Sequence, residues 1–240
     1  MSESLDGQSV VIIGGSSGIG LATARAAQAQ GARVTIVGRD KDRLAAALDE
    51  LGGAADGDTF DVADEAAVKA FFATHDGIDH VVNLAGTHVN GAIADLTTDD
   101  MRVPVDNRFF GPVHVFKYAP PAMTEGGSIT ICTGVGVARP RPGGAVVSAA
   151  CIASELLAQA MAVELAPLRV NVIRPGIVDT PLLDRMTGGQ KDAVLQGYAK
   201  RVPLKRVGQP EDIADAILFL LTNTYVTGSI LTVDGGVGLI

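Results

Sequence analysis

The chain has 240 residues, 47% of them apolar, with a formal net charge of −8 and a pI near 4.9. This length and apolar content suit one α/β domain with a sizeable core, and we expect residues 1–240 to form a single domain. The acidic balance lacks the basic surface of nucleic-acid-binding proteins and argues against a nucleic-acid partner.

Targeting and metal-binding patterns are missing from the sequence. Residues 1–7 have neither the basic start nor the apolar core of a signal peptide. No apolar run approaches the roughly 18 residues that a membrane helix needs. The two cysteines, Cys132 and Cys151, lack metal-ligand spacing and fit buried thiols in a reducing compartment. We therefore expect a cytoplasmic protein with no membrane association and no metal.

The first predicted element is a strand–turn–helix unit near the N-terminus. Four branched apolar residues, Val10–Ile13, predict a strand buried on both faces, and an alanine-rich helix ends near Gly31. The turn between them carries the glycines Gly14-x-x-x-Gly18-x-Gly20. Such glycines permit tight turning, backbone approach to phosphate and close helix–strand packing, and the helix N-terminus favours negative charge. The unit predicts a dinucleotide site, although an ordinary strand-to-helix loop has the same outline.

Strands and helices alternate along the rest of the chain. This alternation predicts a Rossmann-type, doubly wound parallel sheet with three layers, an α/β fold. Further strands are expected at 33–37, 58–62, 80–86, 128–133, 169–174 and 229–233. Helices are expected at 41–51, after a cap at Asp64, and at 103–123, 148–165 and 210–221. A polar insertion at about 179–203 is expected to be a lid, because long loops in compact domains are usually functional.

The residues after the second strand indicate which cofactor binds. In dinucleotide folds an acidic side chain there binds the adenosine ribose and selects NAD. Here the corresponding segment is Gly38-Arg39-Asp40, and an arginine favours the 2′-phosphate of NADP(H) through charge-assisted bonds. Ser16 or Ser17 adds a hydroxyl contact. NADP(H) is therefore expected, with NAD(H) less favoured. In the alternative reading Arg39 is a solvated charge and Asp40 caps the next helix.

Five motifs occur in order along nearly all of the chain: Gly14–Gly20, Asp61–Val62, Asn83–Gly86, Arg174–Thr180 and Val233–Gly236. With these motifs the chain resembles a short-chain dehydrogenase/reductase. The resemblance implies that Asp61 and Val62 meet the adenine and that Ile177 and Thr180 hold the nicotinamide amide. The expected cofactor-binding set is Gly14, Ser16, Ser17, Gly18, Ile19, Gly20, Arg39, Asp61, Val62, Asn83, Ala85, Gly86, Pro175, Gly176, Ile177 and Thr180.

The sequence departs from this family at its Tyr-x-x-x-Lys pair. Val147 stands where the tyrosine is expected and Cys151 where the lysine is expected. The family's tyrosine exchanges the substrate proton, and its lysine lowers the tyrosine pKa and binds ribose. Valine does neither, and acid–base help is typically worth about 10²- to 10⁴-fold, or roughly 3–5 kcal/mol. Positioning of the hydride donor is a separate contribution, so a reactive quinone or dicarbonyl remains a plausible acceptor.

Arg108 and Thr133 are the expected catalytic replacements. Arg108 falls at the family's asparagine position, and its permanently protonated guanidinium can polarise a carbonyl but cannot act as a ready base. Thr133 lies beside the family's serine position and is expected to donate a hydroxyl hydrogen bond. His88 has a pKa suited to proton transfer, although a surface-loop role is favoured. Arg139 and Arg141 either bind an anionic substrate or are solvated loop charges.

The leading interpretation is an atypical NADP(H)-dependent oxidoreductase that transfers hydride to an activated carbonyl or quinone-like substrate. One alternative is a catalytically silent NADP(H)-binding sensor or scaffold, and another is a redox-neutral reaction on the same fold. The helix at 148–165 is apolar all round and needs a cover. Relatives are commonly dimers or tetramers, so a homodimer or homotetramer is expected.

Overall fold

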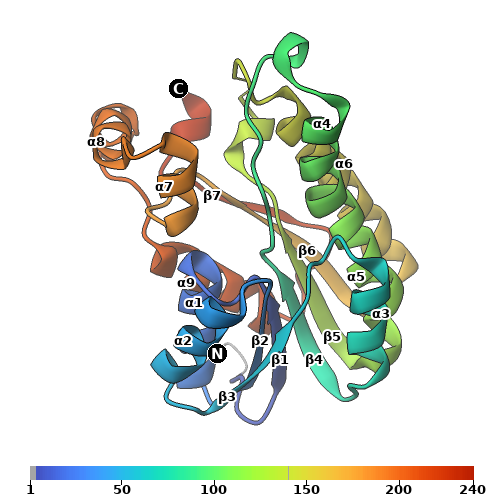
Figure 1. Cartoon of the computed structure of the whole chain (residues 1–240). Coiled ribbons are helices and arrows are strands. Elements are labelled where there is room, and N and C mark those ends of the chain that lie inside the picture. The colour runs from blue at the N-terminus through green and yellow to red at the C-terminus, as the bar shows by residue number, and fades with distance from the viewer. Residues whose placement is uncertain (1–3, 140) are drawn as a thin grey trace.

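A seven-stranded parallel sheet organises the computed structural model, which describes residues 4–139 and 141–240 (Figure 1). The strands are β1 Ser9–Ile13, β2 Arg33–Gly38, β3 Ala55–Thr59, β4 Ile78–Asn83, β5 Met123–Cys132, β6 Arg169–Pro175 and β7 Ile230–Val233. Their order across the sheet is β3-β2-β1-β4-β5-β6-β7. The chain direction across the sheet reverses between β1 and β4, and ligands of such folds bind outside the carboxyl ends of the strands at that point. The predicted Rossmann-type fold is confirmed.

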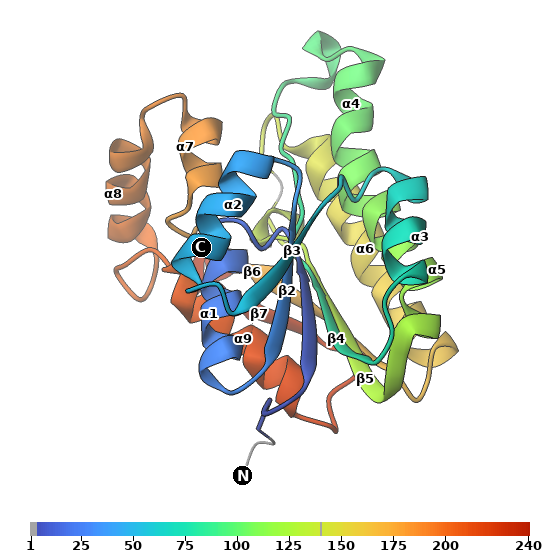
Figure 2. The same ribbon diagram turned by 60° about the horizontal axis from the view of Figure 1, so that its bottom comes forward.

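Helices cover both faces of the sheet (Figures 1 and 2). One face carries α1 Gly18–Ala29, α2 Lys41–Glu50 and α9 Pro210–Thr222. The other carries α3 Glu65–Ala73, α4 Thr98–Val105, α5 Gly111–Tyr118 and α6 Ala145–Glu164. Short 3₁₀ turns lie at Ile93–Asp95, Pro120–Ala122, Val135–Val137 and Val237–Leu239. The insertion after β6 contains α7 Pro181–Thr187 and α8 Lys191–Arg201, which project beyond the sheet (orange in Figure 1).

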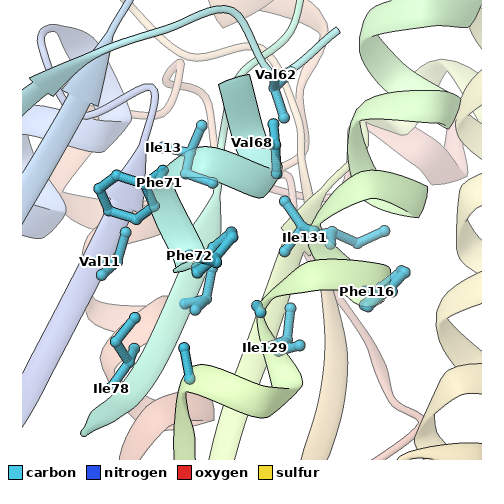
Figure 3. Packing of buried hydrophobic residues seen from close by; sticks show 14 of the residues in the cluster. Val11, Ile13, Val62, Val68, Phe71, Phe72, Ile78, Phe116, Ile129 and Ile131 are labelled. Carbon is cyan, nitrogen blue, oxygen red and sulfur yellow. The ribbon is translucent and has the colours of Figure 1, made fainter. Parts of the chain in front are cut away.

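The core consists of two apolar layers, one on each face of the sheet. Successive side chains of a strand point to opposite faces, and β1 follows this rule. Val11 and Ile13 join the layer beneath α3 and α5, which Figure 3 shows with Phe71 and Phe72, and Val10 and Ile12 join the layer beneath α1 and α9. Burying each such side chain stabilises the fold by about 1.5–3 kcal/mol. The prediction that β1 is buried on both faces is confirmed.

The third strand lies earlier than predicted. It was expected at 58–62, but β3 spans Ala55–Thr59, where it pairs with β2 from Val34 to Gly38. The apolar residues Phe60 and Val62 suggested a strand there, yet both are buried in the loop that follows it. The backbone of an edge strand pairs according to its neighbour, and this strand has no apolar alternation to reveal its register.

The helix predicted at 103–123 begins and ends earlier in the structure. The chain is helical from Thr98 to Tyr118, with a π turn at Asp106–Phe110 between α4 and α5. A reciprocal capping box between Thr97 and Asp100 starts the helix earlier. It ends at Tyr118, before Pro120 and Pro121, although Pro104 and Pro112 lie within the helical run, so proline alone does not decide where this helix ends.

Helix α6 corrects the expectation that no segment has the length of a membrane helix. Its 20 residues are long and apolar enough to cross a membrane, by length and composition alone, which is weak evidence for one such helix. In this fold α6 packs beside β6 and α4. It also contains a buried carboxylate, Glu155, which is 1% exposed.

Candidate active site

A cavity of about 1190 Å³ opens at the carboxyl ends of the central strands. Its wall is built from the turn before α1, the segments after β2, β4, β5 and β6, the π turn and the start of α6. Fourteen residues of the expected cofactor-binding set lie on this wall, namely Gly14, Ser16, Ser17, Gly18, Ile19, Gly20, Arg39, Val62, Ala85, Gly86, Pro175, Gly176, Ile177 and Thr180. The four residues Arg108, Thr133, Val147 and Cys151 lie there too. Asp61 and Asn83 are not wall residues; Asn83 is 2% exposed, and its side-chain amide oxygen Oδ1 accepts from the Ala85 N–H.

The glycine turn has the geometry of a phosphate cradle. Gly14 adopts φ +87°, and its N–H donates to the Val37 carbonyl at 2.8 Å. A Cβ on Gly20 would lie 2.1 Å from the Gly14 carbonyl oxygen, so α1 approaches the turn more closely than any side chain permits. Ser17 caps α1 without a side-chain hydrogen bond, and the first turn has no acidic residue. The free N–H groups at the N-terminus of α1 are therefore suited to bind a diphosphate.

Arg39, which follows β2, makes side-chain hydrogen bonds to two other segments of the chain. Its guanidinium donates to the Asp61 carboxylate at 3.0 Å and to the Thr87 hydroxyl at 3.4 Å. Asp61 also accepts from the Asn107 amide at 3.3 Å, and the buried Oδ1 of Asn107 has no partner within the described residues. Asp40 caps α2 by accepting from the Arg43 N–H. Arg39 is therefore an ion-paired side chain at the cavity wall, while the capping role of Asp40 is confirmed.

The π turn carries Arg108 into the cavity wall, where it is 7% exposed. Its Nε donates to the Thr87 carbonyl at 3.1 Å, its Nη2 to His88 Nδ1 at 3.0 Å, and its Nη1 lies 4.0 Å from the Cys151 thiol. A Cβ on Gly86 would lie 2.6 Å from Nη2, so the guanidinium lies close against the backbone here and would have to shift if this glycine were replaced. The Ser154 hydroxyl of α6 donates to the Arg108 carbonyl at 2.5 Å, which anchors the irregular turn. π turns of this kind are frequent at functional sites.

The groups that surround Arg108 are neutral. Burial and the nearby guanidinium lower the pKa of His88 from 6.5 to about 3. Because arginine can only donate, Nδ1 of His88 accepts, and the neutral ring carries its proton on Nε2. Burial raises the pKa of the Cys151 thiol above its usual value, although the Arg108 charge opposes the rise. His88 is thus an ordered cavity residue rather than the surface-loop histidine favoured by the sequence, and Cys151 stays a thiol.

Thr133 belongs to a second buried network, which the sequence did not reveal. Its hydroxyl donates to Glu155 Oε1 at 2.8 Å. Glu155 also accepts from Arg174, with Nε–Oε1 at 2.9 Å and Nη2–Oε2 at 2.5 Å. In this arrangement the Thr133 hydrogen is donated to Glu155, and the expected hydrogen bond from Thr133 to a substrate stays a prediction. Its oxygen remains an acceptor at the wall. A glutamate in the middle of the apolar helix predicted at 148–165, whose other acidic residue, Glu164, lies near its end, was the one available signal of Glu155.

Val147 and Cys151 are buried on the wall one helical turn apart on α6. Cys151 contacts the Arg108 guanidinium. The family resemblance leads us to expect acid–base chemistry from this segment. Here it presents the isopropyl group of Val147 and the thiol of Cys151 to the cavity. Of the two loop arginines, Arg141 lines the cavity and Arg139 is exposed away from its wall.

Comparison with known proteins places these features in a family. A sequence model of the family described as enoyl-(acyl carrier protein) reductase matches residues 14–238. The short-chain dehydrogenase/reductase ATR9 of Stachybotrys chlorohalonatus is 33% identical over 250 residues, which cover 96% of each chain. The structure of the MalC reductase/Diels-Alderase from Malbranchea aurantiaca has a TM-score of 0.91 and 32% identity, covering 98% of each chain. A small-chain dehydrogenase solved in complex with NADPH has a TM-score of 0.86 and 31% identity, covering 98% of this chain and 100% of that chain.

These matches extend from the glycine turn to the C-terminal motif. That motif is ordered by Asp234, whose carboxylate accepts from the N–H groups of Gly236 and Gly238, each at 2.8 Å. The parallel sheet, the glycine cradle and the length of the matches agree, and the chain belongs to the short-chain dehydrogenase/reductase family of oxidoreductases.

Proposed function

We propose that the protein is an atypical NADP(H)-dependent oxidoreductase that reduces an activated carbonyl or quinone-like compound without a tyrosine proton donor. One observation carries the proposal: a complete glycine cradle shares its cavity with Val147 and Cys151 at the positions expected for tyrosine and lysine. This arrangement supports a protein that keeps the groups suited to cofactor binding but lacks the acid–base pair expected from the family resemblance.

The cofactor is proposed to bind with its diphosphate at the N-terminus of α1 and its nicotinamide near Ile177 and Thr180. Arg39 is proposed to bind the 2′-phosphate, exchanging its contact with Asp61 for a charge-assisted phosphate contact. The related dehydrogenase solved with NADPH supports this choice. When bound, a reduced nicotinamide supplies a hydride.

Arg108 is proposed to be the electrostatic helper in the reaction. Its fixed guanidinium can stabilise the negative charge that develops on a carbonyl oxygen, and its position is preset by Thr87, His88 and Ser154. It cannot give up its proton. Water is proposed to supply the proton, since no tyrosine, glutamate or histidine other than His88 lines the described cavity wall. This mechanism favours acceptors that are already reactive.

Loss of NADPH absorbance with a panel of dicarbonyls and quinones tests the proposal. Arg108→Gln should lower kcat/KM by about 10- to 100-fold, the range of a lost charge-assisted hydrogen bond. Arg139→Gln, exposed and off the cavity wall, should leave kcat/KM unchanged. Unchanged turnover in Arg108→Gln removes Arg108 from the mechanism. Micromolar NADPH binding without oxidation of any acceptor favours the sensor or scaffold alternative.

A redox-neutral reaction in the same cavity is the second candidate. It is supported by the similarity to MalC, which is described as both a reductase and a Diels-Alderase. A large cavity with a fixed cation and no strong base suits reactions that depend on orientation rather than proton transfer. Product formation without net change in NADPH distinguishes it.

A homodimer or homotetramer is also proposed. The outer face of α6 exposes Ile152 (51%), Leu156 (69%) and Val163 (80%), and Val103 and Phe110 are exposed on the adjacent helix. Several exposed apolar side chains on two packed helices are typical of subunit contacts. The mass in solution tests the proposal, and a mass corresponding only to monomer contradicts it.

A further inference from the structure

The charges around the cavity are unevenly distributed. The chain has a net charge of −8, yet the acidic residues on the described cavity wall are Asp40, which caps α2, and Asp42 in its first turn. At this proposed nucleotide end the wall also carries three cations, Arg39, Lys41 and Arg43. The segments after β4 and β5, together with the π turn, contribute Arg108 and Arg141 to the wall. In a low-dielectric cavity such a distribution produces a positive potential that favours anions.

Arg108 is a buried cation with no carboxylate partner among residues 4–139 and 141–240. Its printed contacts are a carbonyl, a neutral imidazole and a thiol. Buried charges are normally paired, because removing an ion from water costs several kcal/mol. Arg174 is paired in the usual way, because it makes a bidentate contact with the Glu155 carboxylate.

Arg108 also has hydrogen-bond donors to spare. A guanidinium has five N–H groups, and three of those on Arg108 have partners in the described residues. One N–H on each Nη nitrogen remains. Two donors and one positive charge match a ligand with two adjacent oxygens and one negative charge.

Arg141 supplies a second cation at the more exposed part of the wall. Its Nη1 donates to the Tyr198 hydroxyl of α8, and its guanidinium carbon lies 5.1 Å from the centre of the Tyr198 ring. Tyr198 packs against Val135, Val202 and Val237. Arg141 is thus held by the insertion without a carboxylate partner in the described part of the chain.

We propose that the substrate is an anionic activated carbonyl compound of the 2-oxo carboxylate type. Arg108 binds its carboxylate and carbonyl oxygens, and Arg141 attracts the anion at the entrance. This inference rests on the proposed function and specifies its substrate class. In the reduction the carbonyl carbon accepts a hydride from the reduced nicotinamide, the C=O π pair moves to oxygen, and that oxygen takes a proton from water, giving a 2-hydroxy carboxylate.

Binding of unreactive analogues to the NADP⁺-loaded protein tests the charge requirement without turnover. N-phenyloxamate and N-phenyloxamide share the same carbonyl and ring but differ by one negative charge. The wild-type protein should bind the oxamate about 10- to 100-fold more tightly, as expected for charge-assisted hydrogen bonds. Arg108→Gln should abolish the preference, and Arg108→Lys should keep part of it because the charge remains. Arg141→Gln should reduce it several-fold, and Arg139→Gln should leave it unchanged.

Retained NADPH affinity and far-UV circular dichroism establish that each variant is folded. Equal binding of the two analogues, binding of neither at millimolar concentration, or a preference that survives Arg108→Gln overturns the inference. Reduction of neutral dicarbonyls by NADPH would then still support the proposed function. Failure to bind NADP(H) at all would instead refute the proposed function itself.

Discussion

Replacing Glu155 by glutamine changes the charge of a side chain that is 1% exposed and keeps its shape. Oε1 accepts from the Thr133 hydroxyl and from Arg174 Nε, and Oε2 accepts from Arg174 Nη2. A glutamine whose oxygen takes the Oε1 position keeps the first two contacts. Its amide nitrogen then meets Nη2, which is also a donor. The substitution therefore leaves one donor unpaired and the Arg174 charge without its counter-ion.

The magnitude follows from how deeply each partner is buried. Removing one partner of a fully buried ion pair costs about 3–5 kcal/mol. The Arg174 side chain is 18% exposed, so water stabilises part of its charge. We therefore expect Glu155→Gln to lower the free energy of unfolding by about 2–4 kcal/mol. For a chain of this size that corresponds to a fall in Tm of roughly 4–16 °C.

Urea unfolding at neutral pH measures this loss. Glu65→Gln is the matched control, because Glu65 makes exposed contacts with Lys117 and Tyr118, and their loss should cost much less than the loss of the buried Glu155 contacts. The double variant Glu155→Leu/Arg174→Met should be more stable than Glu155→Gln, since it buries no unpaired charge. A loss in Glu155→Gln no greater than in the control would refute the reasoning.

Three further predictions concern the cofactor, the pH and the missing pair. Arg39→Gln should raise the Kd of NADPH by about 10- to 100-fold and leave that of NADH unchanged, as measured by fluorescence titration; an equal loss for both contradicts a 2′-phosphate contact. The pKa of His88 is near 6.5 in the unfolded chain but about 3 in the folded protein, so the unfolded chain takes up a proton first as the pH falls. The free energy of unfolding should therefore be highest above pH 6.5 and should fall towards pH 3, by up to about 1.4 kcal/mol per pH unit. Unfolding measured across this range should depend less steeply on pH in His88→Gln, and identical slopes contradict the lowered pKa. The double variant Val147→Tyr/Cys151→Lys should gain ketone reduction only when Arg108→Asn is added. Without that change the new ammonium lies beside the Arg108 guanidinium, which is 4.0 Å from the Cys151 thiol. We expect the triple variant to reduce ketones about 10²-fold faster than the double variant, and equal rates refute the repulsion.

Several features of the fold were predictable because they arise from local chemistry. The four apolar residues Val10–Ile13 must be buried on both faces of a strand, and the glycines at 14, 18 and 20 permit a turn that no side chain allows. Asp64 accepts from the Ala67 N–H and caps α3 as expected. Edge strand β3 was misplaced and the π turn was not predicted, since pairing with a neighbouring strand and packing against α6 decide these features.

In the candidate site, too, some features are determined by the sequence and others depend on the tertiary structure. The residue types at positions 147 and 151 are properties of the sequence, and valine cannot exchange a proton in any fold. The partners of Arg108 and Thr133 come from residues 20 to 46 positions away, so their contacts depend on how α6, the π turn and the loop after β4 pack together. The sequence therefore determined that a valine and a cysteine stand at the positions where the family resemblance leads us to expect tyrosine and lysine. Only the tertiary structure decided that Thr133 donates to a buried carboxylate while Arg108 has no carboxylate partner among the residues that the structure describes, because burial and charge pairing are properties of the assembled fold.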